Sequence, residues 1–538
     1  MKRHNIIKIV LLTLALFLVL TWIFPSAYFQ TSYVEQGRIQ MGLFDMFSYP
    51  VTALSYFGYI AIYVLVVGGL YGVLNHISAY RVLLDKMIKT FKGSEKIVLS
   101  VIMTILALIV SFCGLQYGLL LVFPFIISLV LMMGYNKVVA ALTTVGSVMV
   151  GMIGTTFAYN NTNLLSSYLS LKVTENIIYN IIILVLGLVL LIAYTMWYIS
   201  KKLPKNSKSK AAELEQFVPK SVSAKESSGV RVWPITLFSI LLLVVMILSF
   251  TAWSAVFNVT LFEKFVGSTL ASLGMPVYAV LLCIFGITNV IILIKLLVKG
   301  REGKGRYKGL IKTNIILLIG FVISSIIGSL AVKGGFVSWL KTDVTIFSKI
   351  LGTVNAFGNW SLTEISLCVV IYAIIISAIY KVKVDDFIEN FIEGVKKAFV
   401  PALIVLLVYT GLVIVTYHPF QLAIYKAIFG ITKGFNIFTA SIVAILSSLF
   451  NADPLYTFNS AIPYLISLVT DTSVYPVIWM IFQGVYGVTM MVAPTSIILM
   501  ITLNYLNIPY QSWLKRTWIL SLSLLFLVLI ISLIMILI

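Results

Sequence analysis

Apolar runs of about 20 residues recur along the whole chain and alternate with short polar or basic segments. A helix of that length crosses the hydrocarbon core of a bilayer. The first run, 6–24, follows Lys2 and Arg3 in the manner of a signal peptide, but no small-residue cleavage site comes after it, so we interpret it as a retained span. The pattern predicts an all-α polytopic membrane protein.

Two kinds of apolar segment can be told apart by length. The longer ones predict about 11 spans, at 6–24, 53–76, 137–170, 177–199, 233–254, 276–298, 313–332, 362–380, 398–418, 474–507 and 517–538. The shorter ones, at 97–112, 118–134, 436–450 and 455–471, come in pairs around a polar interruption. We interpret each pair as a re-entrant hairpin. The amphipathic stretches 79–96, 381–397 and 419–433 are expected to lie at the membrane surface.

The order of these segments repeats. Pro124–Val130 and Pro463–Val469, each in a second hairpin arm, share five of seven residues. With an odd number of spans between them, the two units are predicted to be inverted, each with one hairpin and one broken span. The predicted regions are a first repeat at 1–199, a basic linker at 200–232, three extra spans within 233–361 and a second repeat at 362–538.

The positive charge is distributed between the spans. The formal net charge is +20, with 60% hydrophobic and 10% charged residues, and the basic residues lie scattered in loops rather than on one soluble face. This favours membrane topology over nucleic-acid binding. Placing the basic loops inside predicts a multi-pass plasma-membrane protein with a cytoplasmic N-terminus, a cytoplasmic linker at 200–232 and an external C-terminus.

Polar residues at the interruptions are the candidate binding residues. Backbone groups stranded at membrane depth survive only when they are buried in protein or line a wet cavity, so the hairpin tips and helix breaks are expected to meet one another or a ligand. The candidates for substrate or ion binding are Ser111, Cys113, Gly114, Gln116 and Tyr117 at the first tip, Asn160, Asn161, Thr162 and Asn163 at the first break, Asn451 and Asp453 at the second tip, and Gln483, Tyr486, Thr489, Thr495 and Ser496 at the second break. About half of them are expected only to satisfy backbone groups.

Asp453 is the sharpest single candidate. A carboxylate near the middle of a bilayer usually serves as an ion ligand, a proton carrier or a counter-charge. Asp453 also precedes Pro454, which is the normal arrangement of an N-cap followed by the first helical residue, and both roles can hold together. A transported Na⁺ is expected near Asn161 and Asp453, with H⁺ as the alternative coupling ion.

The sequence lacks the residue patterns that metal sites and several classes of enzyme require. The three cysteines, Cys113, Cys283 and Cys368, lie in separate apolar segments without metal-ligand spacing. The sequence contains no phosphate-binding loop, no zinc-protease motif and no nucleophile elbow. We therefore expect no enzymatic activity, no structural metal and no cofactor.

The C-terminal part resembles a known family. A glycine-rich break at Gly484 leads to Pro494–Ser496 and then to the motif Ile508–Lys515, which is similar to the signature of the YfcC-like and anaerobic dicarboxylate carriers. Gly68-Gly69 and the hairpin with Pro124 are similar to the N-terminal half of that family, so the resemblance covers nearly the whole chain. It implies the ion-transporter superfamily fold, with inverted repeats, two hairpins, two broken helices and a homodimer.

The tips depart from that family pattern. Related carriers often have an acidic pair after the first tip, where this chain has Gln116 and Tyr117, and a Ser/Gly-rich second tip, where it has 451–454. The resemblance therefore leaves the substrate open among small carboxylates, including amino acids and dicarboxylates. We expect a secondary active transporter, a symporter or an antiporter, that works by alternating access. The alternative is a passive channel.

Overall fold

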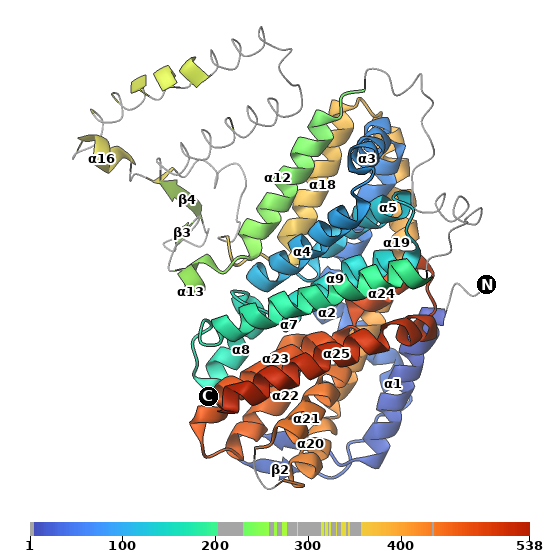
Figure 1. Ribbon diagram of the computed structural model, residues 1–538, viewed down its shortest axis with the longest axis vertical. Helices are drawn as coiled ribbons and strands as arrows, with labels where there is room; N and C mark the ends of the chain where they lie inside the picture. Colours follow the sequence, from blue (N-terminus) through green and yellow to red (C-terminus); the bar gives the residue numbers. More distant parts are fainter. Residues whose placement is uncertain are drawn as a thin grey trace. The chain divides into compact units, whose positions relative to one another are not determined.

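The computed structural model describes residues 5–202, 230–257, 357–432 and 435–537, together with short segments and single positions between 263 and 344 (Figure 1). Most of the predicted span 276–298, half of the predicted span 313–332, most of the linker 200–232 and Cys283 lie outside the described residues. The chain divides into a unit made of Met1–Val256 with Trp360–Ile538 and a second unit, Phe257–Asn359.

The first unit contains the elements that the sequence predicts to carry the function. Its N-terminal part comprises α1 (Asn5–Ile23), β1 (Ala27–Phe29), β2 (Tyr33–Glu35), α2 (Asp45–His76), α3 (Ser78–Phe91), α4 (Glu95–Cys113), η1 (Gly118–Leu121), α5 (Phe123–Met132), α6 (Lys137–Ala141), η2 (Leu142–Gly146), α7 (Ser147–Ile153), α8 (Tyr159–Leu169) and α9 (Ile177–Lys202). Its remaining elements are α12 (Trp233–Phe250), α13 (Trp253–Phe257, whose last residue belongs to the other unit), α18 (Leu362–Ile379), α19 (Val384–Tyr417), α20 (Gln421–Phe429), α21 (Ile437–Phe450), α22 (Pro454–Ser467), η4 (Thr472–Val474), α23 (Tyr475–Met490), α24 (Ile497–Leu506) and α25 (Tyr510–Leu537).

Two small β-structures were not predicted. In the first unit β1 and β2 pair antiparallel, with Tyr28 opposite Val34, because a tight turn joins two short extended segments. In the second unit β3 (Glu263–Phe265), β4 (Ser272–Pro276) and β5 (Asp343–Val344) form an antiparallel sheet in that order, and α16 (Gly335–Leu340) is a short helix.

The helices of the first unit are those of a membrane protein. Eight helices of the described part are long and apolar enough to cross a bilayer: α1, α2, α4, α9, α12, α18, α19 and α25. They carry large apolar side chains on their outer faces as well as in the core; Leu12, Val189 and Phe526 are exposed examples. A helix that is apolar all round suits a lipid surround rather than water. The predicted all-α polytopic class is therefore confirmed.

The most extensive helix packing in the first unit is the antiparallel pair α2 and α19, one helix from each half of the chain. The two backbones touch at Gly68, Gly72 and Gly394: a Cβ on Gly394 would lie 2.1 Å from the carbonyl oxygen of Gly68. Small residues allow helices in a membrane to approach this closely. Gly68 therefore serves close packing of α2 against α19.

Three predicted boundaries were wrong. The amphipathic stretch 381–397 and the span 398–418 form one helix, α19, which continues through Pro401. The first break lies at 154–158, so the polar run Tyr159–Asn163 begins α8 instead of interrupting a span. The second break lies at 491–496, so Gln483 and Tyr486 are inside α23. A membrane helix tolerates polar residues whose side chains find partners in neighbouring helices.

Candidate functional site

The first hairpin tip is hydrogen-bonded to the first helix break. The Ser111 hydroxyl, in the last turn of α4, donates to the carbonyl oxygen of Gly154 at 2.6 Å and lies 3.1 Å from the Thr156 hydroxyl. The Thr156 N–H donates to the Ser111 carbonyl oxygen at 2.9 Å. These bonds satisfy backbone groups that the break would otherwise strand in an apolar environment. Ser111 therefore has a structural role.

Gln483 connects the two halves of the chain. Its side-chain amide nitrogen, on α23, donates to the carbonyl oxygens of Ile153 at 3.2 Å and Thr155 at 3.3 Å, both at the first break. Its amide oxygen accepts from the Trp479 indole at 2.7 Å. The prediction that placed Gln483 at the second break was wrong in position, because the residue serves the break of the other half.

The two hairpin tips meet. The hydroxyls of Tyr117, at the first tip, and Tyr486, on α23, donate to the same acceptor, the Ala452 carbonyl oxygen at the second tip, at 3.3 Å and 3.1 Å. The second tip is a tight connection between α21 and α22, which pack against each other. The expectation that the interruptions come together is confirmed for the two tips and the first break.

Asp453 is the N-cap of α22. Its Oδ1 accepts from the backbone N–H of Leu455 at 2.9 Å, and Pro454 is the first helical residue, as the sequence predicted. As a whole, residue Asp453 is half-buried. The ion pairs found among the described residues are Arg81–Asp85 and Lys397–Glu393, so Asp453 has no cationic partner there.

Tyrosine hydroxyls lie beside Asp453 instead. Tyr117 at the first tip and Tyr486 on α23 both donate to the carbonyl oxygen of Ala452, the residue before Asp453. Neutral hydroxyls can hydrogen-bond a carboxylate in either protonation state. Asp453 thus sits where elements of both halves converge, without a fixed counter-charge among the described residues.

The second break is supported by two residues that the sequence analysis did not select. The Tyr510 hydroxyl and the Trp513 indole, both on α25, donate to the carbonyl oxygens of Val492 at 2.5 Å and Met491 at 2.9 Å. Both belong to the motif Ile508–Lys515, so that motif was the available signal. It stabilises the stranded carbonyl groups of the break.

The support is incomplete at the C-terminal side of this break. Among the described residues, the hydroxyls of Thr495 and Ser496 are buried and have no hydrogen-bond partner. They directly precede α24, and the first turn of a helix presents backbone N–H groups and partial positive charge. A buried hydroxyl without a partner is costly, and both hydroxyls retain the capacity to hydrogen-bond a polar group.

The remaining candidate residues differ in whether their side chains have hydrogen-bond partners. Three side chains donate to a backbone carbonyl oxygen four residues earlier: Asn451 to Ser447, Cys113 to Ile109 and Thr162 to Ala158. The amide nitrogen of Asn160 lies 3.5 Å from the carbonyl oxygen of Phe250, and that of Asn161 lies 3.5 Å from the sulfur of Met152. Gly114 adopts φ +70° against Asn161, which leaves no room for a Cβ. Gln116 and Thr489 are buried, and the side-chain oxygen of Asn163 is buried without a partner in the described part of the chain.

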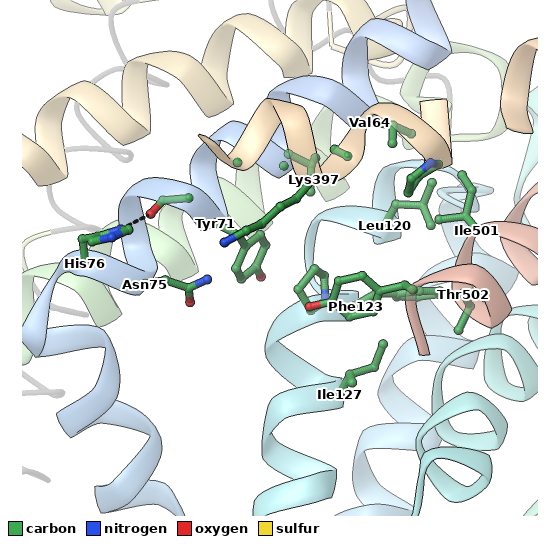
Figure 2. A pocket seen from close by; sticks show the side chains of 18 residues that line it. Val64, Tyr71, Asn75, His76, Leu120, Phe123, Ile127, Lys397, Ile501 and Thr502 are labelled. Atoms are coloured by element: carbon green, nitrogen blue, oxygen red, sulfur yellow. Dashed lines mark hydrogen bonds between the residues drawn. The ribbon is translucent and has the colours of Figure 1, made fainter. Parts of the chain in front are cut away.

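A cavity of about 200 Å³ lies between α2, α5, α19 and α24 (Figure 2). None of the candidate residues lines it. Figure 2 shows Lys397 reaching across it from α19, with Asn75 and His76 on one side and Ile501 and Thr502 on the other. Apolar side chains line most of the remaining wall, and no local sequence pattern indicates the cavity because its lining comes from four separate segments.

Two interrupted helices and two touching hairpin tips inside an apolar helical unit define a membrane transport protein rather than an enzyme. The family model described as C4-dicarboxylate anaerobic carrier, DcuC, matches residues 33–538. The chain therefore belongs to this carrier family, and the resemblance of its C-terminal motif is confirmed.

Individual relatives are more distant. An uncharacterized protein of Haemophilus influenzae is 27% identical over 146 residues, which are 26% of this chain and 28% of that protein. The crystal structure of the YdaH transporter of Alcanivorax borkumensis, described as having an unusual topology, is 12% identical with a TM-score of 0.37, covering 99% of this chain and 97% of its own.

Proposed function

We propose that this chain is a secondary active carrier of a C4-dicarboxylate that works by alternating access. The family supplies the substrate class. The observation that carries the proposal is the pair of buried hydroxyls without partners, Thr495 and Ser496, at the start of α24. Hydroxyl donors at a helix N-terminus suit one carboxylate of a dianion.

The broken helices and the tips complete the proposed site. Most of the first break is closed by internal hydrogen bonds, whereas the second keeps free donors, so we assign recognition of one substrate carboxylate to the second break. Asp453 is proposed to carry the coupling cation, H⁺ or Na⁺, since an acidic residue would repel the substrate. The proposal also includes an inverted relation of the two halves, a homodimer and a cytoplasmic N-terminus.

Removing the two free hydroxyls tests the site. We expect Thr495→Val and Ser496→Ala each to raise the KM for a C4-dicarboxylate about tenfold, because a hydrogen bond to a charged group contributes about 1.5–3 kcal/mol. The measurement is counterflow in proteoliposomes with a panel of dicarboxylates and amino acids. Thr143→Val is the control, since that buried hydroxyl already donates to the carbonyl oxygen of Val139, four residues earlier. A wild-type KM in both variants would contradict the site.

The same vesicles test the carrier mechanism. Accumulation of substrate against its gradient, driven by Na⁺ or by a pH difference, is expected from a secondary carrier. A passive channel equilibrates its solute and cannot accumulate it. Faster transport of an amino acid than of any dicarboxylate would assign the other substrate class.

A further inference from the structure

The cavity of Figure 2 occupies one end of the α2–α19 pair. Small residues form its wall along this seam: Gly68 and Gly72 on α2, and Gly394 and Ala398 on α19. They bring the two backbones together without filling the space in front of them. Facing that wall are α5 and α24, so all four helices contribute to one hollow.

Aromatic rings close the opposite end of the same pair. Phe57 on α2 stacks on Tyr409 of α19, with ring centroids 4.0 Å apart and planes inclined by 7°. Nearer the end, Tyr49 stacks on Tyr417 at 5.6 Å, and its hydroxyl lies 2.7 Å from Nε2 of His418. The helices are antiparallel, so the cavity and the stacked rings lie at opposite ends of the pair. The cavity leaves one end of the helix pair open, and the stacked rings fill the other end.

The cavity extends toward the proposed site. Ile501 in its wall is five residues after Ser496 on α24, a helical distance of about 7.5 Å. Leu120, also in the wall, is three residues after Tyr117 of the first tip. The inner part of the cavity therefore lies within about two helical turns of both the free hydroxyls and the meeting tips.

Lys397 supplies positive charge at this cavity. Its ammonium group pairs with Glu393 one turn earlier on α19, at 2.6 Å, and both side chains are largely exposed. An exposed pair of this kind contributes little stability, so an incoming carboxylate can replace Glu393. Asn75 and His76 add polar groups at the same cavity.

We propose that this cavity is the open entrance to the carrier's central site and that Lys397 draws the dianionic substrate into it. The inference rests on the proposed function. Under this proposal, the described conformation is open at the C-terminal end of α2 and closed at the N-terminal end of α2.

Cysteine labelling tests the entrance without requiring transport. In a background with Cys113, Cys283 and Cys368 replaced by serine, Ile501→Cys is exposed to membrane-impermeant methanethiosulfonate reagents of either charge, applied from each side. We expect labelling from one side only, slowed by a C4-dicarboxylate. Thr410→Cys, near the stacked rings, is the matched position and is expected to stay unlabelled.

The role of the Lys397 charge is tested by introducing the substitution Lys397→Gln into the Ile501→Cys variant. The anionic reagent is expected to label about fourfold more slowly, while the cationic reagent is not slowed, because one unit charge a few ångströms away is removed. Lys396→Gln, an exposed neighbour outside the cavity wall, should change neither rate. An equal change for both reagents would overturn the role of Lys397.

The two proposals fail separately. Normal dicarboxylate uptake with Ile501→Cys unlabelled from both sides overturns the entrance and leaves the proposed function standing. Labelling with the expected sidedness and charge dependence, but no dicarboxylate uptake, supports the entrance and overturns the proposed function.

Discussion

Replacing Gly72 with alanine is expected to destabilise the protein by about 3 kcal/mol, the upper end of the usual cost of overpacking. A Cβ at this position would lie 2.2 Å from the carbonyl oxygen of Asn390 and 2.8 Å from the Cα of Gly394. Both atoms belong to the backbone of α19, so they cannot move aside without separating the two helices. The loss is measured as a fall in the apparent unfolding temperature of the purified protein.

Gly58→Ala, on the same helix, is the control. Its added Cβ meets only the tip of the Leu54 side chain, at 3.1 Å, which can rotate away. Alanine also favours a helix over glycine by about 1 kcal/mol, so this variant is expected to be neutral or slightly more stable. Equal unfolding temperatures for the Gly72 and Gly58 variants would show that α2 and α19 do not touch through their backbones.

Asp453→Asn is expected to reduce concentrative uptake by about tenfold or more while leaving stability unchanged. Asparagine caps a helix as well as aspartate does, so the bond to the Leu455 N–H is kept and only the charge is lost. Uptake is measured in proteoliposomes at several pH values, with and without Na⁺. If the coupling ion is H⁺, the variant resembles the protonated carrier and should retain exchange that no longer depends on pH.

Asp471→Asn provides the matched comparison. Asp471 also caps a helix, η4, by accepting from Ser473 at 2.9 Å, but it is exposed. That variant should transport normally. Asp453→Ala, which removes cap and charge together, should in addition lose about 1 kcal/mol of stability. Unchanged uptake and unchanged ion dependence in Asp453→Asn would leave Asp453 as a cap alone.

Much of the fold could be predicted because the bilayer imposes simple rules on the sequence. Apolar length predicted the polytopic helical class, and polar interruptions predicted that two tips and two breaks exist. Asp453 followed by Pro454 was recognised as a helix start because capping is local chemistry. Where the deciding interaction lay within a few residues, the sequence was sufficient.

The site could be predicted only in part because its interactions connect distant segments. Gln483 bonds to Ile153 and Thr155, more than 300 residues away, and no local pattern indicates that. The breaks were predicted too wide because glycines and polar residues were taken as their markers: Thr495 and Ser496 do lie at the second break, but Gln483 lies inside a helix with its amide bonded to a neighbour. The cavity has the same difficulty, since four helices far apart in the sequence supply its wall.

The packing of α1 and α18 has a consequence for biosynthesis. α1, from the first half, packs on α19, and α18, from the second half, packs on α2; α7 and α9 likewise pack on α23 and α25. The first half therefore leaves the ribosome with contact faces that only later helices can cover. Its assembly is completed after the second half has entered the membrane, and a chain that stops before α19 leaves the glycine face of α2 open to lipid and to quality-control proteases.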